Sequence, residues 1–178
     1  NGRFLSEARS REEVHKILLD FAAQSGLIDF VQLITLEQNN PEQLTTAHHW
    51  GRTPIPDWPL PEISRQLFPF EAQLSQNKIV RLTDIPRFLS ETPHLKQLLA
   101  GDDIRTVSMI PITAENNWLG ALILQARAEK ALSERELQPI HTLADQAAIT
   151  LANQQLLRQT ELLYQIGRSL SQALTRDD

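Results

Sequence analysis

The chain contains no cysteine among its 178 residues. This absence excludes disulfide bonds, thiolate metal sites and thiol nucleophiles, and it fits a reducing cytoplasm, where we expect the protein to act. No stretch approaches the ~18 consecutive apolar residues of a membrane-spanning helix, so we expect none. The net charge of −5 gives no broad attraction to nucleic acid, and no nucleic-acid partner is expected.

Patterns that carry catalysis or bind metals are also missing. There is no glycine-rich phosphate loop and no nucleophile beside a base. His48 and His49 lie in a strand-like stretch, where adjacent side chains point to opposite faces, so the two cannot ligate one metal together. Asp102 and Asp103 suit a turn better than a metal site or an acid–base pair. We therefore expect a module without enzymatic activity and without a metal site.

Two helices are indicated by their start signals. Ser10 with Glu13, and Ser133 with Glu136, have the spacing of capping boxes. An apolar stripe after the first box predicts a helix over residues 10–24. The pattern after the second box continues to residue 174, and residues 140–174 alone would span about 50 Å. This length exceeds a small domain, so the far half of this helix must pack on something outside it.

Two hairpins are predicted between these helices. Residues 28–37 and 44–50 form the first, and residues 105–113 and 117–127 form the second. The last of these strands is apolar on both faces, which is typical of a buried central strand. Within it, Gly120 indicates a close approach of another backbone, and Pro111 on its partner indicates a bulge or an unpaired edge.

The segment between the hairpins, residues 51–104, has a different composition. Seven of the ten prolines lie between positions 54 and 93, and proline interrupts both helices and strands. We expect short helices at 62–67 and 94–99, a short strand at 78–83, and loops. A segment of this kind shapes a surface on a scaffold that other residues build.

The order of these elements, and two motifs in particular, resemble GAF domains. The motifs are SMIPITAENNWLGALIL at residues 108–124 and LSERELQPIHTLADQAAITLANQQLL at residues 132–157. The resemblance covers residues 10–157 and implies an α+β fold with an antiparallel sheet of about five strands. The first and closing helices would cover one face of the sheet, and the loops and short helices of the middle segment would form a pocket on the other.

The resemblance also implies the organisation of the chain. Residues 1–9 would be a lead-in, a cloning remnant or a helical linker. Residues 158–178 are similar to the helix that opens another such domain, so they would form a helical linker into a following module. We expect the chain to be a piece of a longer sensor protein with neighbouring domains.

The ligands of the family can be weighed against the residues present. Its reductase branch works through cysteines and covalent bilin attachment needs a thiol, so both are excluded. Asp84-Ile85-Pro86 is similar to the Asp-Ile-Pro of phytochromes, although an aspartate there also suits an ordinary turn. A haem held by one histidine stays open without support, because a surface or hydrogen-bonded histidine is the better explanation in each case.

Cyclic-nucleotide binders of the mammalian type carry Asn-Lys, then Phe, then an acidic pair. Asn77, Lys78 and Phe88 match, but Thr92 and Pro93 stand in place of the acidic pair. A nucleotide is therefore unsupported, and the cofactor is left unknown.

Candidate pocket residues come from the middle segment and its neighbouring strands. Aromatic side chains here either line a cavity for a planar ligand or fill it as core, which is the commoner use. Basic side chains either attract an anion to the pocket mouth or form a solvated rim. The candidates are Trp50, Phe68, Arg81, Asp84, Phe88, Arg105 and Ser108, with Trp58 and Phe70 as further aromatics.

The function expected from this pattern is a regulatory sensor module in a bacterial-type signalling protein such as a histidine kinase or a nucleotide cyclase. It would bind a small ligand and relay binding through the closing helix. Leu156, Leu163, Ile166 and Leu170 form an apolar seam that predicts a parallel homodimer, with the first helix near the same axis. The alternative is a ligand-free scaffold for dimerisation and interaction.

Overall fold

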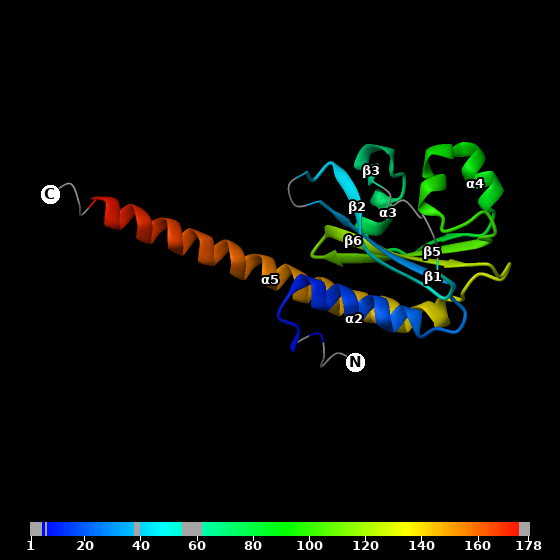
Figure 1. Ribbon diagram of the computed structural model, residues 1–178, viewed down its shortest axis with the longest axis horizontal. Coiled ribbons are helices and arrows are strands. Elements are labelled where there is room, and N and C mark those ends of the chain that lie inside the picture. Colours follow the sequence, from blue (N-terminus) through cyan, green and yellow to red (C-terminus); the bar gives the residue numbers. More distant parts are fainter. Residues whose placement is uncertain (1–4, 6, 38–39, 55–61, 175–178) are drawn as a thin grey trace.

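The computed structural model describes residues 5, 7–37, 40–54 and 62–174. Six antiparallel strands form one sheet in the order β3-β2-β1-β6-β5-β4. Helices α2 and α5 lie on one face of this sheet, and the short helices of the middle segment lie on the other (Figure 1). The predicted α+β architecture is confirmed, with one strand more than the approximate five expected. Trp58 lies outside the described residues.

The elements are, in chain order, α2 (Arg11–Ala23), β1 (Phe30–Leu36), β2 (Gln43–Gly51), β3 (Glu62–Ser64), a 3-10 helix (Arg65–Leu67), α3 (Glu71–Ser75), β4 (Val80–Leu82), α4 (Ile85–Glu91), a second 3-10 helix (Pro93–Leu98), β5 (Thr106–Ala114), β6 (Asn117–Ala126) and α5 (Glu134–Leu174). Both predicted hairpins are present.

The sixth strand is β3, where a short helix over residues 62–67 was expected. That prediction was wrong for its first half, because Ile63 pairs with Leu44 and is buried under the middle segment. Only residues 65–67 are helical, in a 3-10 turn. Three residues carry too little local preference to indicate a strand, and β3 exists through pairing with the edge of β2.

Both long helices begin at the predicted caps. Ser133 and Glu136 form a reciprocal capping box: the Glu136 amide donates to Ser133 Oγ at 3.3 Å, and the Ser133 amide donates to Glu136 Oε2 at 2.7 Å. In α2 the Glu13 amide donates to Ser10 Oγ at 3.2 Å, but the Glu13 carboxylate accepts from the amide of Arg9 instead of Ser10. The cap of α2 therefore satisfies the amide of Arg9, one residue before the Ser10 amide that the motif implies.

The two central strands, β1 and β6, meet where Gly120 pairs with Thr35. A Cβ on Gly120 would lie 2.3 Å from the backbone oxygen of Ile34, closer than real side chains come. This is the close backbone approach that the sequence predicted. Pro111 lies beyond the end of β4, which pairs with β5 only as far as Met109, and a register shift follows at Ile112.

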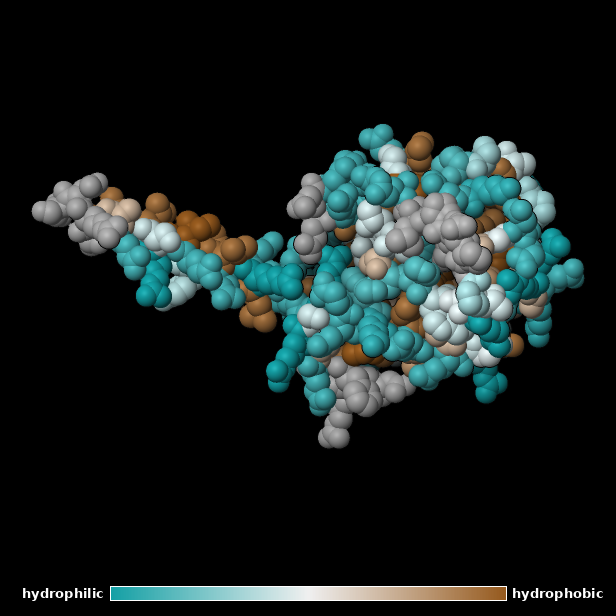
Figure 2. Space-filling view, in the orientation of Figure 1, coloured by the Kyte–Doolittle hydropathy of each residue, from teal (hydrophilic) through white to brown (hydrophobic). Residues whose placement is uncertain are grey.

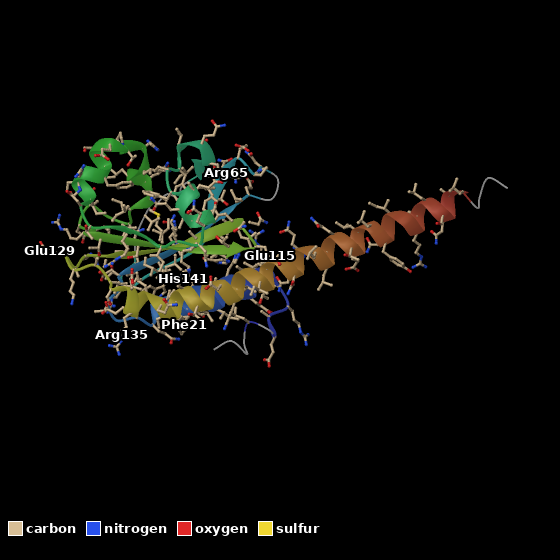
Figure 3. The ribbon with its side chains drawn as sticks, turned by 180° about the vertical axis from the view of Figure 1, so that it is seen from behind. Phe21, Arg65, Glu115, Glu129, Arg135 and His141 are labelled. Atoms are coloured by element: carbon tan, nitrogen blue, oxygen red, sulfur yellow. The ribbon has the colours of Figure 1, made fainter. Side chains whose placement is uncertain are left out.

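The sheet separates two hydrophobic cores. One lies between the sheet and the helices α2 and α5, and includes Leu18, Leu33 and Leu122. The other lies between the sheet and the middle segment, and includes Phe30, Met109 and Ile123. Successive side chains of the central strands pack alternately into the two cores, because each of these strands is covered on both faces. In Figure 3, Arg65 of the middle segment lies on the side opposite Phe21 of α2 and Arg135 of α5.

Helix α5 is longer than the domain it covers. Its buried residues begin at Leu137 and end at Leu151. Residues 152–174, the projecting half of α5, extend away from the sheet (Figure 1). Within the described residues, no helix is both long and apolar enough to cross a membrane.

Candidate functional site

The middle-segment face of the sheet carries a cluster of aromatic side chains. Phe68 stacks on Trp118 of β6 with ring centroids 5.8 Å apart and nearly parallel planes. Phe70 meets the edge of Phe68 at 5.5 Å, and Phe88 of α4 lies 5.7 Å from Phe70. Phe68 and Trp118 are buried in the core on this face, and the half-buried Phe70 and Phe88 pack against it, so these rings contribute to the core.

A buried glutamine fastens the middle segment to the sheet. Gln125 of β6 is fully buried, and its Nε2 donates to the carbonyl of Leu98 at 2.8 Å while its Oε1 accepts from the amide of Ala100 at 2.8 Å. Both polar atoms of the side chain are therefore used. The loop after the second 3-10 helix is held on β6 by side-chain bonds in place of a strand ladder.

A second buried glutamine on this face is only half satisfied. Gln32 of β1 is fully buried and donates from Nε2 to Thr46 Oγ1 at 2.6 Å. Its Oε1 has no hydrogen-bond partner among the described residues. Because Gln32 pairs with Ile123 of the middle-segment core, its side chain lies on that face. A buried acceptor without a donor costs about 1–3 kcal/mol, so Gln32 leaves an unsatisfied acceptor in the middle-segment core.

The predicted pocket residues do not share one surface. Trp50 packs against the core beneath α2, on the opposite face from Phe68 and Phe88. Ser108 is buried and pairs with Leu124 of that same helix-side core, so its side chain faces away from the middle segment.

The charged candidates are at the surface. Arg81 is exposed on β4 opposite Ser108, and Arg105 is exposed just before β5. Asp84 is the N-cap of α4, where Oδ1 accepts from the Arg87 amide at 3.1 Å. Of the seven candidates, Phe68, Phe88 and Asp84 belong to the middle-segment side. Within the described residues, no group of three or more His, Asp or Glu side chains could hold a metal ion.

A polar network joins the middle segment to α5 around the edge of the sheet. Asn77, in the left-handed conformation with φ of 59°, follows α3. Its Nδ2 donates to Asp145 Oδ1 at 3.0 Å, and its Oδ1 lies 3.1 Å from His141 Nε2. Figure 3 labels His141 on the part of α5 beneath the sheet. The network passes from one face to the other without crossing the core.

Sequence reasoning missed this network and the Gln125 clamp. Each consists of single polar residues from segments far apart in the chain, and their partners are set by the fold. A polar residue that ends the apolar run of β6 was the one available signal for Gln125.

A histidine is buried between α2 and the sheet. His15 is 3% exposed, and its ring meets the edge of the His48 ring with centroids 5.6 Å apart. The pKa of His15 is lowered from 6.5 to about 4, chiefly by burial, then by the positive charge of Arg11 and the neighbouring His48, against a smaller opposing effect of Glu12. The ring is therefore neutral at physiological pH.

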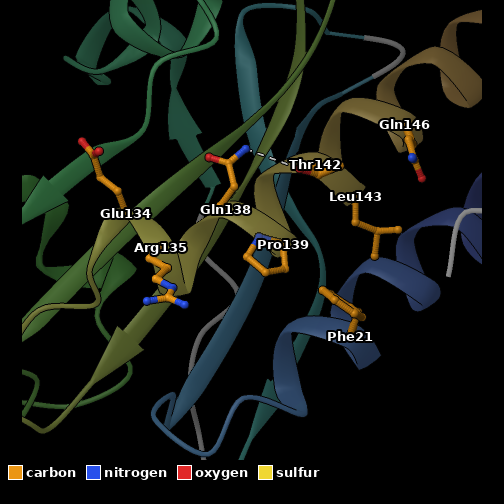
Figure 4. A pocket seen from close by; sticks show the side chains of 8 residues that line it. All are labelled: Phe21, Glu134, Arg135, Gln138, Pro139, Thr142, Leu143 and Gln146. Atoms are coloured by element: carbon orange, nitrogen blue, oxygen red, sulfur yellow. Dashed lines mark hydrogen bonds between the residues drawn. The ribbon is translucent and has the colours of Figure 1, made fainter.

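Three of the recesses in the described part of the chain lie along α2 and α5. One, of about 660 Å³, is open and lies between the end of α2 and the start of α5, where Phe21 and Leu143 point toward one another and Pro139 forms part of the wall (Figure 4). Another, of about 490 Å³, continues along α2 past the same Phe21 and Leu143. The third, of about 610 Å³, lies where α5 leaves the domain.

The projecting half of α5 exposes large apolar side chains. Leu156, Leu163, Ile166 and Leu170 are between 55% and 70% exposed. Hydrophobic residues stand out on this part of the helix in Figure 2. At 100° per residue, Leu156, Leu163 and Leu170 lie about 140°, 120° and 100° around the helix from the buried Leu151, so these leucines are turned away from the side that covers the sheet, whereas Ile166 lies about 60° from Leu151.

Known proteins share this fold. The family model of the GAF domain matches residues 8–151. A structure of the GAF domain of PixJ from Thermosynechococcus elongatus, in its blue-light-absorbing form, superposes with a TM-score of 0.67 at 21% identity, covering 88% of this chain and 94% of that one. A GAF domain/HD domain protein from Geobacter sulfurreducens gives 0.68 at 21% identity, covering 85% and 98%.

The GAF domain of a two-component sensor histidine kinase from Bacillus halodurans superposes with a TM-score of 0.64 at 20% identity, covering 84% of this chain and 99% of that one. Comparison with curated protein sequences gives no match. The family model covers most of the chain and the superpositions cover the same architecture, so this chain belongs to the GAF domain family.

Proposed function

We propose that the chain is a regulatory module of a signal-transduction protein, which acts as a dimer and passes conformational changes to a neighbouring domain through α5. The observation that carries the proposal is the exposed apolar seam of Leu156, Leu163, Ile166 and Leu170 on a helix rooted in the core. Exposed leucines seven residues apart are stabilised when an identical helix pairs with them in parallel, because each leucine then meets its own copy.

The charge pattern favours a second copy of this chain as the occupant of the seam. Positions 155, 160, 162, 167 and 169, which would flank the seam, hold no charged residue. Flanking charges normally set partner choice and helix orientation. Their absence leaves self-matching of the leucines as the determinant of pairing.

The Asn77–His141–Asp145 network supports a route for conformational change from the middle-segment face of the sheet to α5. A displacement of α3 and the loop after it would change hydrogen bonds made directly to α5. A helix that is continuous from its buried root to residue 174 transmits such a shift as a change of pose. One of the GAF domains that superpose on this chain belongs to a two-component sensor histidine kinase.

The input would be a small ligand bound on the middle-segment face beside Gln32, whose Oε1 lacks a donor. Phe68, Phe88 and Asp84 remain the candidates for this site. The alternative, a ligand-free scaffold, is favoured by the packing of Phe68, Phe70 and Trp118 on one another. Native mass spectrometry of the purified protein separates the two, because a co-purified small molecule supports sensing.

Sedimentation of the chain, of a form ending at Leu151, and of Leu163→Glu tests the dimer. We expect the whole chain to be dimeric and both altered forms to be monomeric, because burying a glutamate pair in the seam costs about 3 kcal/mol or more. Tyr164→Glu is the matched control, since Tyr164 is equally exposed but lies off the seam. A monomeric whole chain, or equal loss of the dimer in the control, contradicts the proposal.

A further inference from the structure

We propose that the groove where α5 leaves the domain binds a small organic anion, whose phosphate or carboxylate group lies between Arg11 and Arg158. The groove measures about 610 Å³ and is bounded by the start of α2, the turns of both hairpins and the first turns of the projecting half of α5. This volume falls within the range of small-molecule sites. Its lining includes Asn117, Trp118, Leu151 and Leu162 beside the two arginines.

The first argument is charge. Neither Arg11 nor Arg158 forms an ion pair with any described residue. Arg11 is half-buried, and its side chain donates only a long bond of 3.4 Å to His15. Burial lowers the pKa of Arg11 most, and the charge of Arg158 lowers it further, although Glu12 opposes both. The two cations therefore repel each other, and an anion between them would remove that repulsion.

The second argument is the polar atoms left without partners. Three buried side-chain polar atoms in the described part of the chain lack a hydrogen-bond partner, and one of them, the donor Trp118 Nε1, belongs to a residue that lines this groove. Gln154 Oε1, also of a lining residue, is an acceptor that an anion would not satisfy. Trp118 is 3% exposed, so its N–H is a buried donor without an acceptor. Anions are acceptors, and Glu37 is the one carboxylate among the lining residues.

The remaining lining describes the rest of the ligand. Leu119, Leu151 and Leu162 give apolar walls, while Asn117 and Gln155 offer amide donors. This combination suits a metabolite with an anionic end and an uncharged, partly apolar body, and it does not suit a bare inorganic ion. The core-facing side of α5 changes from alanine and leucine to glutamine and arginine as the helix leaves the sheet. Gln154, Gln155 and Arg158 of α5 therefore line the groove.

The groove stays open in the dimer proposed above. Arg158 lies about 160° around α5 from Leu156, at 100° per residue, so pairing along the seam leaves it uncovered. A ligand there would bridge α2, the hairpins and the projecting half of α5, and would fix the angle at which the helix leaves. This regulatory consequence rests on the proposed relay, whereas binding itself does not.

The test is titration of the purified chain with pyrophosphate, citrate and AMP. Calorimetry measures binding, and NMR spectra monitor the indole N–H signal of Trp118. The Trp118→Phe variant identifies that signal by its loss. We expect at least one probe to bind and to move that signal. AMP is favoured over pyrophosphate if the apolar walls contribute, and citrate reports on carboxylate recognition. Arg158→Gln should weaken binding by about tenfold or more, as loss of a charge-assisted hydrogen bond does.

Arg168→Gln is the matched control, because Arg168 is an exposed arginine on the same helix outside the groove. It should change binding less than about twofold. The proposal is overturned if no probe binds at about 10 mM, or if Arg168→Gln weakens binding as much as Arg158→Gln. Circular dichroism of both variants establishes that the helix is intact, since each residue is exposed and its loss removes no core contact.

Discussion

Acidification should destabilise this domain through His15. The ring is 3% exposed between α2 and β2, beside the positively charged Arg11 and the ring of His48. Its pKa is about 4 in the folded protein against 6.5 for an ordinary histidine. The folded state therefore binds fewer protons than the unfolded state between these values, and stability falls as the pH falls.

The magnitude follows from the shift. A histidine that is neutral when folded contributes its full effect above pH 6.5, and this contribution is lost progressively down to about pH 4. Each unit of difference is worth about 1.4 kcal/mol, so the whole transition removes roughly 3 kcal/mol. Between about pH 7.5 and about pH 5 the expected loss of unfolding free energy is about 2 kcal/mol.

Urea unfolding followed by circular dichroism at these two pH values measures the loss. His15→Gln cannot titrate, so it should lose about 2 kcal/mol less than the unaltered chain over the same interval. All samples are compared at one protein concentration, because dimerisation couples stability to concentration. His94→Gln, at an exposed histidine of the second 3-10 helix, controls for the removal of one imidazole.

The reasoning is refuted if the unaltered chain and His15→Gln lose the same free energy between the two pH values. A native-state NMR titration of the His15 ring with a midpoint near 6.5 would contradict it independently, because the ring would then be protonated without unfolding.

Two further predictions concern the sheet. Gly120→Ala should cost about 3 kcal/mol of unfolding free energy, because its Cβ would lie 2.3 Å from the Ile34 oxygen. The control Gly167→Ala on the projecting helix, where a Cβ meets nothing within 4 Å, should be neutral or stabilise by up to about 1 kcal/mol. Similar losses for both variants in urea unfolding would contradict the close approach. Gln125→Met should lower the unfolding free energy by about 2–4 kcal/mol and accelerate hydrogen exchange at the Ala100 amide, which loses its acceptor. Unchanged exchange there would show that the clamp is not what holds the loop.

The elements themselves could be read from the sequence because their determinants are local. The cap at Ser133 and Glu136 forms as its spacing indicates, and the glycine in the apolar run of β6 lies where two backbones meet. The length of the helical pattern also indicated that the far half of α5 extends beyond its own domain, and Leu163 in that half is 70% exposed. Such signals survive without tertiary context since each depends on residues within a few positions of one another.

What only the tertiary structure decided is which side of the sheet each side chain faces and which distant residues meet. Trp50 and Ser108 lie on the helix side because strand register, not composition, assigns faces, and a shift of one residue reverses them. The Asn77–His141–Asp145 network, the Gln125 clamp and the convergence of Arg11 with Arg158 each join segments separated by at least 25 residues. Polar contacts of this range have no periodic signature, because single side chains make them once the packing of the apolar core has placed their backbones.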